Sequence, residues 1–562
     1  MLCFLITKSY SAWALDAGAD SNSRPSARPL TIPQLPTTSP EITSPEERKS
    51  KSSSRIENTE KKLKIDNIEF SGNTVIETAE LLELSKPYLH KPVSINDLED
   101  LRKIITHLYI DKGFVTSGAT FPPGALQGKT LHIKIIEGKL SEMRIEGNGW
   151  LRDGYIKSRL IKDKDEPLNM KELQNRFRLL LTDPLFDHLN GRLIPGQERG
   201  VSILDIDVTR ARPYQLTFVS DNYRTPSIGA IAEGGYGWIR NLTSQGDFLD
   251  FSYMHSDGAQ QMSGSWVVPI WDYGTKAYLI SSHSSSTIID SKLASLNIHS
   301  NTFTIEGGIN QLIIDNIDRR LTLSAGIGVK ENSTSLLGQS FSFIPGQPTG
   351  NNQVSFVRFN QEYIERWATQ VLAVRSTFSV GINAFGASTT ANPMNPSSNY
   401  FAWLGQGQYN WRLPYLTGTD VVFKNNLQLA NSSLMPLERI AVGGRYTVRG
   451  YRENWLVRDN GFSGTAEVHL PILPMILNNP QPNYRLDLVP FFDYGSAWNN
   501  PDGVQSPTTH TYLYSSGLGF MLKLPHVNSE LYWGQALKAA NPKTTGNLQD
   551  SGIHFQVRVD AF

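Results

Sequence analysis

The feature that most constrains this chain is an alternation of apolar and polar residues that begins after Arg210 and continues to residue 562. A period of two residues is the pattern of a β-strand with one apolar and one polar face. We count about sixteen such stretches, starting at Gln215. In one of them the apolar positions are Leu321, Leu323, Ala325, Ile327 and Val329. The last two-thirds of the chain is therefore expected to be all-β.

The alternation fits a soluble sandwich as well as a membrane barrel, so the decision depends on what each face meets. The polar positions are rich in Gln, Asn, Ser, Gly and Arg, which suits a wet lumen. Aromatic residues near strand ends suit the girdles of a membrane barrel; they are Trp266, Trp271, Trp411 and Tyr415. The final strand ends on the aromatic Phe562, an ending common in outer-membrane barrels. We predict an antiparallel transmembrane β-barrel of about sixteen strands over residues 211–562.

Composition excludes several other classes of protein. Lys plus Arg and Asp plus Glu both number 53, so no long-range field draws the chain to nucleic acid. No run of about 18 apolar residues exists, which argues against transmembrane helices. No G-x-S-x-G, H-E-x-x-H or P-loop motif is present, the 11 His are scattered, and Cys3 is the only cysteine. We expect no catalytic, cofactor-binding or metal-binding residues.

Residues 65–210 contain an internal repeat. Ile68-x-Phe70-x-Gly72-Asn73 recurs as Met143-x-Ile145-x-Gly147-Asn148, and the Pro-Gly-x-x-x-Gly that starts at Pro123 recurs at Pro195. Helical spacing follows the possible caps Ser94 and Asn169. Each unit thus has the order strand, helices, strands. We predict two small α+β domains, over residues 65–139 and 140–210; two unrelated adaptor domains are the alternative.

The amino-terminal part has the composition of a targeting segment followed by a linker. Residues 1–20 resemble a shortened secretory signal segment. Residues 21–64 are rich in Pro and Ser and then in charge, so we expect a disordered linker. One helix could start at Ser44, because Pro45 and Glu47 follow as first-turn residues, and would cover residues 44–62.

Two short motifs in the barrel region carry a family resemblance. Val448-Arg449-Gly450-Tyr451 lies in the longest interval without a strand pattern, about residues 434–460, between the eleventh and twelfth expected strands. Phe491-x-Asp493-x-Gly495 lies in the thirteenth. With two tandem α+β domains before the barrel, these motifs resemble the outer-membrane transporters of two-partner secretion, the haemolysin-activator and filamentous-haemagglutinin-transporter family (TpsB).

The resemblance implies POTRA (polypeptide-transport-associated) domains in the periplasm and a loop that carries Val448 to Tyr451 back into the barrel. It also implies that a helix at residues 44–62 could plug the pore. The residues themselves agree with an inward loop. A guanidinium in a lumen needs an acceptor, and Asp493 on a polar-facing strand position can supply it. We therefore predict an Arg449–Asp493 pair; a solvated loop arginine and an ordinary lumen hydrogen bond are the alternatives.

The remaining residues of the two motifs also have physical readings. Gly450 allows a tight turn at the loop tip, and Gly495 leaves room for the loop to approach the wall. We expect Tyr451 to pack its ring on the wall with its hydroxyl in water. Asp221-Asn222 resembles the start of the barrel in the family, and an Asx turn explains it equally well.

The resemblance implies export of an unfolded partner exoprotein of the TpsA type, encoded nearby, which is captured in the periplasm and passed through the pore without ATP. The chain would reside in the outer membrane, with its amino-terminal domains in the periplasm. Outer-membrane lipid and lipopolysaccharide, and the barrel-assembly machinery during biogenesis, would be its other partners. An outer-membrane protein insertase of the same superfamily and a passive porin or receptor are the alternatives. We expect no enzymatic activity.

Overall fold

The computed structural model describes residues 30, 32, 41–43, 63–161, 163, 165–271, 274–392, 394–416, 418–476, 484–501, 508–538 and 547–561. The predicted signal segment, nearly all of the predicted linker with its helix at residues 44–62, and Phe562 lie outside these residues. The described chain forms two compact units, one within residues 38–211 and the other the barrel from residue 212 onward, against which Leu30 and Ile32 pack. None of the described helices has the length and apolar character needed to cross a membrane.

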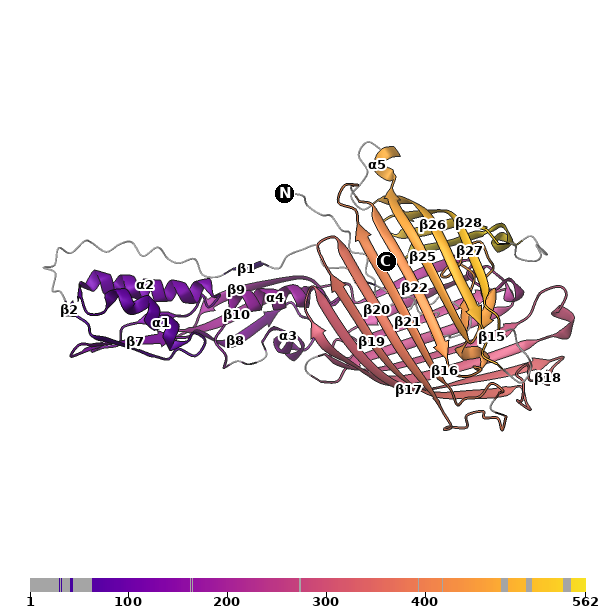
Figure 1. The fold of residues 1–562 in the computed structure, drawn as a ribbon, viewed down its shortest axis with the longest axis horizontal. Coiled ribbons are helices and arrows are strands. Elements are labelled where there is room, and N and C mark those ends of the chain that lie inside the picture. The colour runs from indigo at the N-terminus through magenta and orange to yellow at the C-terminus, as the bar shows by residue number, and fades with distance from the viewer. Residues whose placement is uncertain are drawn as a thin grey trace. The chain divides into compact units, whose positions relative to one another are not determined.

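The first α+β domain packs two helices on a small sheet (Figure 1). Its sheet has the order β3-β7-β5, with β6 paired to β7. Helix α2 starts at a capping box, in which Ser94 Oγ accepts from Asp97 N. The elements are β2 Leu63–Lys64, β3 Asn67–Ser71, α1 Thr78–Ser85, β4 Pro92–Val93, α2 Ile95–Asp111, β5 Gly118–Thr120, β6 Leu126–Gln127 and β7 Thr130–Ile136.

The second α+β domain has the same general order of a strand, two helices and further strands, and β1 joins its sheet. Its sheet runs β1-β9-β10-β8, and a core built around the fully buried Phe177 fills the space beneath helix α4. Asn169 caps that helix by accepting from Lys171 N and Glu172 N. The elements are β1 Glu41–Thr43, β8 Lys139–Glu146, α3 Asp153–Leu160, α4 Met170–Leu181, β9 Phe186–Pro195 and β10 Val201–Arg210.

The repeated Gly-Asn turn makes the same contacts within each of the two domains. A Cβ on Gly72 would lie 2.4 Å from Ile135 O, and one on Gly147 would lie 2.1 Å from Val208 O, so glycine is required where each turn crosses the sheet. Each following asparagine donates to the carbonyl three residues on, Asn73 to Ile76 O at 2.9 Å and Asn148 to Leu151 O at 2.6 Å. The repeat therefore extends to individual hydrogen bonds.

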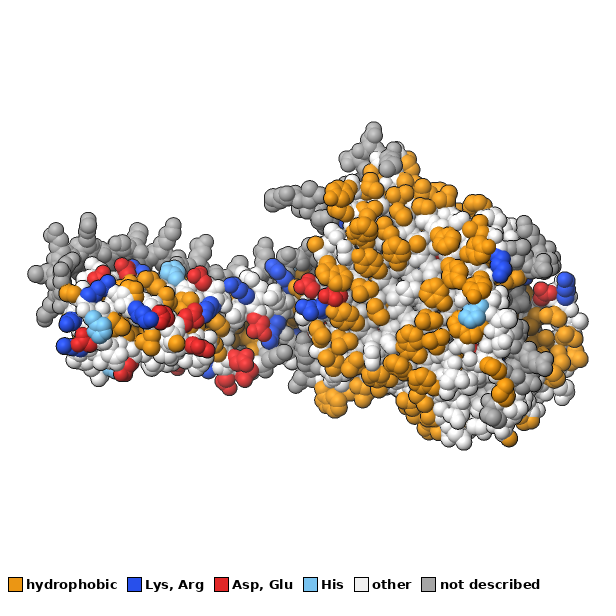
Figure 2. Space-filling model, viewed as in Figure 1, with side chains coloured by type: hydrophobic (Ala, Val, Ile, Leu, Met, Phe, Trp, Pro, Cys, Tyr) orange, Lys and Arg blue, Asp and Glu red, His pale blue; other side chains and the backbone are white. Residues whose placement is uncertain are grey.

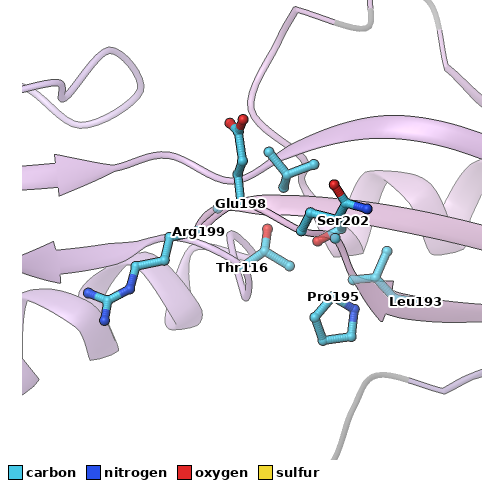
Figure 3. A pocket seen from close by; sticks show the side chains of 10 residues that line it. Thr116, Leu193, Pro195, Glu198, Arg199 and Ser202 are labelled. Atoms are coloured by element: carbon cyan, nitrogen blue, oxygen red, sulfur yellow. The ribbon is translucent and has the colours of Figure 1, made fainter.

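The junction between the two α+β domains is closely packed. Lys139 N donates to Gly200 O at 2.7 Å, and a Cβ on Gly200 would lie 2.4 Å from Ile136 Cγ2. Beside this junction lies a hollow of about 330 Å³, which is lined by Thr116 and by the turn between β9 and β10 (Figure 3). The side chains of Glu198 and Arg199 point in different directions there, so the hollow has no cluster of charge.

The barrel closes from sixteen long antiparallel strands among the described residues, as the sequence predicts, and the two-residue β18 (Gln339–Ser340) pairs with the end of β17. Each strand pairs with the next, and β29 returns to β11. The strands are β11 Tyr214–Asp221, β12 Ala232–Arg240, β13 Phe248–Ser256, β14 Ala259–Pro269, β15 Thr275–Thr287, β16 His299–Asp315, β17 Arg319–Leu336, β19 Asn351–Arg366, β20 Gln370–Ile382, β21 Phe401–Arg412, β22 Asp420–Ala430, β25 Asn460–Pro471, β26 Arg485–Trp498, β27 Thr511–Lys523, β28 Val527–Ala536 and β29 Ile553–Asp560.

The two faces of the barrel wall divide as the alternation predicts. On β16, Phe303 and Ile305 are exposed on the outside, whereas Thr304 and Glu306 are buried on the inside. On the side of the barrel that Figure 2 shows, hydrophobic side chains cover much of the surface and charged ones are sparse. Such an outer face suits hydrocarbon, because an exposed charge at the bilayer midplane is costly.

The barrel closes at a seam between β11 and β29, and the side chain of Asn222 extends the pairing there. Strands β11 and β29 pair over only five residues, Thr217–Asp221 with Gln556–Asp560. Beyond the end of β11, the Asn222 amide donates to Ile553 O at 2.9 Å and accepts from Phe555 N at 2.8 Å. Asp221 forms the Asx turn, because its Oδ1 accepts from Tyr223 N at 3.0 Å. Asn222 thus extends the ladder of the seam.

Candidate functional site: an inward loop bound to the barrel wall

The chain between β22 and β25 folds back along the inner wall of the barrel. It contains the short helix η5 (Pro436–Glu438) and an antiparallel ribbon of β23 (Ile440–Val442) and β24 (Leu456–Arg458). The sequence pattern gave no indication of this ribbon. Its apolar side chains pack with Ala497 and Leu513 of the wall. The interval lies between the eleventh and twelfth strands, so Val448 to Tyr451 occupies the tip region of an inward loop.

Arg449 is held by two carboxylates of the wall. Its backbone N, Nε and Nη2 donate to Asp493 at 2.9, 2.8 and 2.7 Å, and its Nη1 donates to Glu467 Oε1 at 2.7 Å. The three side chains are at most 1% exposed. Lys424 Nζ, 3.3 Å from Glu467, balances the second carboxylate. Since buried charges are tolerated only when they are paired, this set fixes the position of the loop.

Aromatic rings of the wall complete the surroundings of the guanidinium. Arg449 Cζ lies 3.5 Å from the centroid of the Phe491 ring and 4.8 Å from that of Tyr532. Cation–π attraction of this kind strengthens when water is excluded. Phe491 therefore faces the lumen beside Asp493, and both bind the same side chain.

Two glycines allow the loop to approach the wall. A Cβ on Gly495 would lie 2.5 Å from Val442 Cγ1 and 2.7 Å from Val448 Cγ2, so the loop occupies the space above this residue. Gly450 has φ +86°, and a Cβ there would lie 2.8 Å from Gly534 O of β28. Any larger residue at these positions would push the loop away from β26 or β28.

The expected environment of Tyr451 is wrong in one respect. Its ring does pack on the wall, but its hydroxyl is not in water. The hydroxyl donates to Lys538 O at 3.0 Å and lies 3.2 Å from Tyr514 O. Its partners are backbone carbonyls of β27 and of the residues that follow β28, which the sequence pattern could not show.

A second buried charge cluster holds the base of the loop. Glu438 of η5 contacts Lys330 Nζ of β17 at 2.6 Å and Arg358 Nη2 of β19 at 3.0 Å. Arg358 Nη1 also donates to Glu306 Oε2 of β16 at 3.0 Å. The four side chains are at most 6% exposed and carry two positive and two negative charges. The loop is therefore bound to the wall on β17 and β19 as well as on β25 and β26, and Glu306 of β16 supports this contact through Arg358.

Two more arginines of the loop pair with acidic residues near the seam, one on β28 and one in the connection between β28 and β29. Arg445 Nη2 donates to Glu530 Oε2 of β28 at 2.7 Å, and Arg452 Nη2 donates to Asp550 Oδ2 at 2.8 Å. Sequence reasoning identified only the Arg449–Asp493 pair. The other pairs could have been sought among the charged residues at strand positions that face the lumen, such as Glu306, Lys330 and Glu467.

Replacing Arg449 tests whether the wall carboxylates hold the loop. Arg449→Met leaves Asp493 and Glu467 with too little positive charge. We expect this to destabilise the bound position of the loop by about 3–5 kcal/mol. We expect hydrogen exchange at residues 447–453 to accelerate at least about a hundredfold in detergent. Arg375→Met is the matched control, because Arg375 pairs with Glu362 on the wall at 2.8 Å and touches no part of the loop that the structure describes. Equal exchange in both variants would contradict the assignment.

Charge balance in the second cluster can be tested by a double replacement. Glu438→Gln leaves two cations with one carboxylate and should lower the stability of the folded barrel by about 3–5 kcal/mol, measured by thermal unfolding in detergent. Lys330→Met together with Glu438→Gln leaves the neutral Arg358–Glu306 pair and should recover at least half of the loss. A double variant as unstable as Glu438→Gln would show that charge balance is not the cause.

Comparison with protein families identifies the two parts of the chain. The profile of the haemolysin secretion/activation protein ShlB/FhaC/HecB family matches residues 200–522, and that of the POTRA domain, ShlB-type, matches residues 63–138. The outer membrane transporter CdiB of Dickeya dadantii (strain 3937) is 19% identical over 422 residues, which cover 72% of this chain and 73% of that protein.

Solved structures share the fold. CdiB from Escherichia coli superposes with a TM-score of 0.66 at 19% identity, over 91% of this chain and 93% of that one. BamA from Haemophilus ducreyi lacking POTRA domains 1–3 gives a TM-score of 0.54 at 12% identity, over 89% of this chain and 100% of that one. CdiB and BamA therefore both share the fold of this chain, and the family profile shows to which family the chain belongs. With more than half of its length matched by the family profile, the chain belongs to the haemolysin secretion/activation protein ShlB/FhaC/HecB family of the outer membrane.

Proposed function

We propose that this chain captures an unfolded partner exoprotein in the periplasm through its α+β domains and exports it through the barrel to the cell surface. Transport runs on binding and folding without ATP, and the chain has no catalytic activity of its own. The observation that supports this most strongly is the loop of residues 434–460, which lies inside the barrel on ion pairs that are almost fully buried. Arg449 and Asp493 act in this proposal as the latch of that loop.

The polar inner wall suits an extended polypeptide as cargo. An unfolded chain carries a donor and an acceptor at nearly every residue, and each needs a partner along the whole path. Thr302, Thr304 and Gln406 are among the buried polar side chains of the wall. While the loop is bound it fills part of this space, so we infer that it moves when cargo passes.

We assign residues 65–139 and 140–210 as two POTRA domains and residues 211–562 as the barrel. The family match at residues 63–138 supports the first domain, and the shared Gly-Asn turn supports the second. Strand edges on such domains can bind an extended segment through main-chain hydrogen bonds, which require little sequence specificity.

An insertase of outer-membrane proteins is the main alternative, because its barrel has the same fold. The family match favours secretion, and so does a chain with two amino-terminal α+β domains. A passive porin would have no use for these domains. Outer-membrane lipid, lipopolysaccharide and the barrel-assembly machinery are the further partners that we propose.

Secretion of the exoprotein encoded beside this chain tests the proposal. Cells that express both proteins should release the exoprotein to the surface or the medium, and cells without this chain should not. Charge reversal by Arg449→Asp or Asp493→Arg should reduce release at least about tenfold, because either change puts like charges together in the buried cluster. Arg375→Met should secrete normally. Release without the chain would contradict the transport function, and normal release by Arg449→Asp would contradict the latch.

A further inference from the structure

The connection that leads into the last strand of the barrel ends in a short helix, η6 (Leu548–Ser551), and Gln549 of this helix joins three segments of the chain. Its side chain is 1% exposed. The Nε2 atom donates to Asn222 O at 2.6 Å and to Arg224 O at 2.7 Å, and Oε1 accepts from Glu453 N at 3.0 Å. One amide therefore ties the connection after β11 and the inward loop to the helix that precedes β29.

The helix is fixed on the barrel through its own backbone. Asn547 Oδ1 accepts from Gln549 N at 2.9 Å and caps the start of the helix. At the other end, Gly552 N donates to Gln549 O at 3.0 Å, and Gly534 N of β28 donates to Gly552 O at 2.9 Å. A Cβ on Gly552 would lie 1.9 Å from Gly534 O, so glycine is required between the helix and the strand. The helix is thus held on β28 and can support the loop.

The loop residues that meet this helix lie close to the latch in the sequence. Glu453 donates its backbone N–H to Gln549, and the preceding residue, Arg452, pairs through Nη2 with Asp550 Oδ2 at 2.8 Å. Two consecutive residues of the loop therefore contact two consecutive residues of the helix. Arg449 stands only four positions before Glu453. A shift of the loop backbone at Glu453 would be passed to Arg449 over this short segment.

The three bonds require an amide at position 549. The carbonyls of Asn222 and Arg224 need a donor and the N–H of Glu453 needs an acceptor, because buried backbone groups are costly without partners. A glutamine side chain presents donors and an acceptor on one planar group. A carboxylate of the same shape could accept from Glu453 but would place an acceptor against two carbonyls. A leucine would satisfy none of the three groups.

We propose that Gln549 is a positioning residue for the inward loop, because it fixes Glu453 against both ends of the barrel and thereby places Arg449 where Asp493 and Glu467 bind it. The inference rests on the proposed function and deepens it, since it assigns a further support to the loop that gates the pore. The helix precedes β29 and its two carbonyl partners follow β11, so this support is complete only when the seam is closed. The loop is therefore fully held only in a closed barrel.

Hydrogen exchange of the purified full-length protein in detergent tests this role. Gln549→Leu should accelerate exchange at residues 447–453 at least about tenfold, because three hydrogen bonds that hold the loop are lost. Gln556→Leu is the matched control. Gln556 is also a buried glutamine at the seam, but it hydrogen-bonds to Asp221 and Arg558 and to no loop residue that the structure describes. This control should change exchange at residues 447–453 less than about threefold.

Gln549→Glu is the second variant if Gln549→Leu does not form a folded barrel, as judged by thermal unfolding. It keeps the shape of the side chain and should also accelerate exchange at residues 447–453 at least about tenfold. If exchange in the Gln549 variants stays within about threefold of the wild type, or if Gln556→Leu accelerates it equally, the positioning role is wrong.

A double variant separates positioning from a general loss of stability. In the Arg449→Met background the loop has already lost the contact that Gln549 aligns, so Gln549→Leu should add less than about threefold to exchange at residues 447–453. An added effect as large as in the wild-type background would show that Gln549 acts independently of Arg449, and would overturn the proposal.

These exchange measurements need no exported protein, so the inference and the transport function fail separately. If the Gln549 variants exchange as the wild type does while cells with the wild type secrete the neighbouring exoprotein, the positioning role is wrong and transport stands. If cells with the wild type do not secrete the exoprotein, the transport function is wrong instead.

Discussion

Pairing of buried charge between the inward loop and the barrel wall is the interaction on which the interior of this barrel depends. Arg449 alone would be too costly to bury, and so would Asp493 or Glu467. Together with Lys424, they form a balanced set, and Glu438 forms a second one with Lys330, Arg358 and Glu306. When the loop leaves the wall, water can hydrate these charged groups, and this offsets part of the lost pairing. A loop bound in this way can be held firmly and still be released.

Much of the fold follows from local sequence. The alternation after Arg210 predicts the sixteen strands and their faces, because each strand meets lipid on one side and the lumen on the other. Ser94 and Asn169 predict the starts of two helices, since each side chain accepts from the first turn. The Arg449–Asp493 contact follows from one further step, because an arginine in a lumen requires an acceptor on a strand that faces it.

The rest depends on contacts between residues far apart in sequence. Lys330, Arg358 and Glu438 look like unrelated polar residues until the strand register places them together. Asn222 can close the seam only because β29 returns beside it. Residues 41–43 form a strand because Gly191 offers a place for Ile42, and nothing near them in the sequence indicates this. The Tyr451 hydroxyl binds a carbonyl of a distant segment, so the residues near it in the sequence do not indicate its partner.

The most direct test of the account is the single-channel conductance of the purified protein in planar bilayers, with and without residues 434–460. If the loop occupies the lumen and is released only at intervals, the wild type should show low or intermittent conductance. The deletion variant should show a larger and steadily open pore. Identical conductance in the two proteins, when both form folded barrels, would contradict the claim that this loop controls the pore.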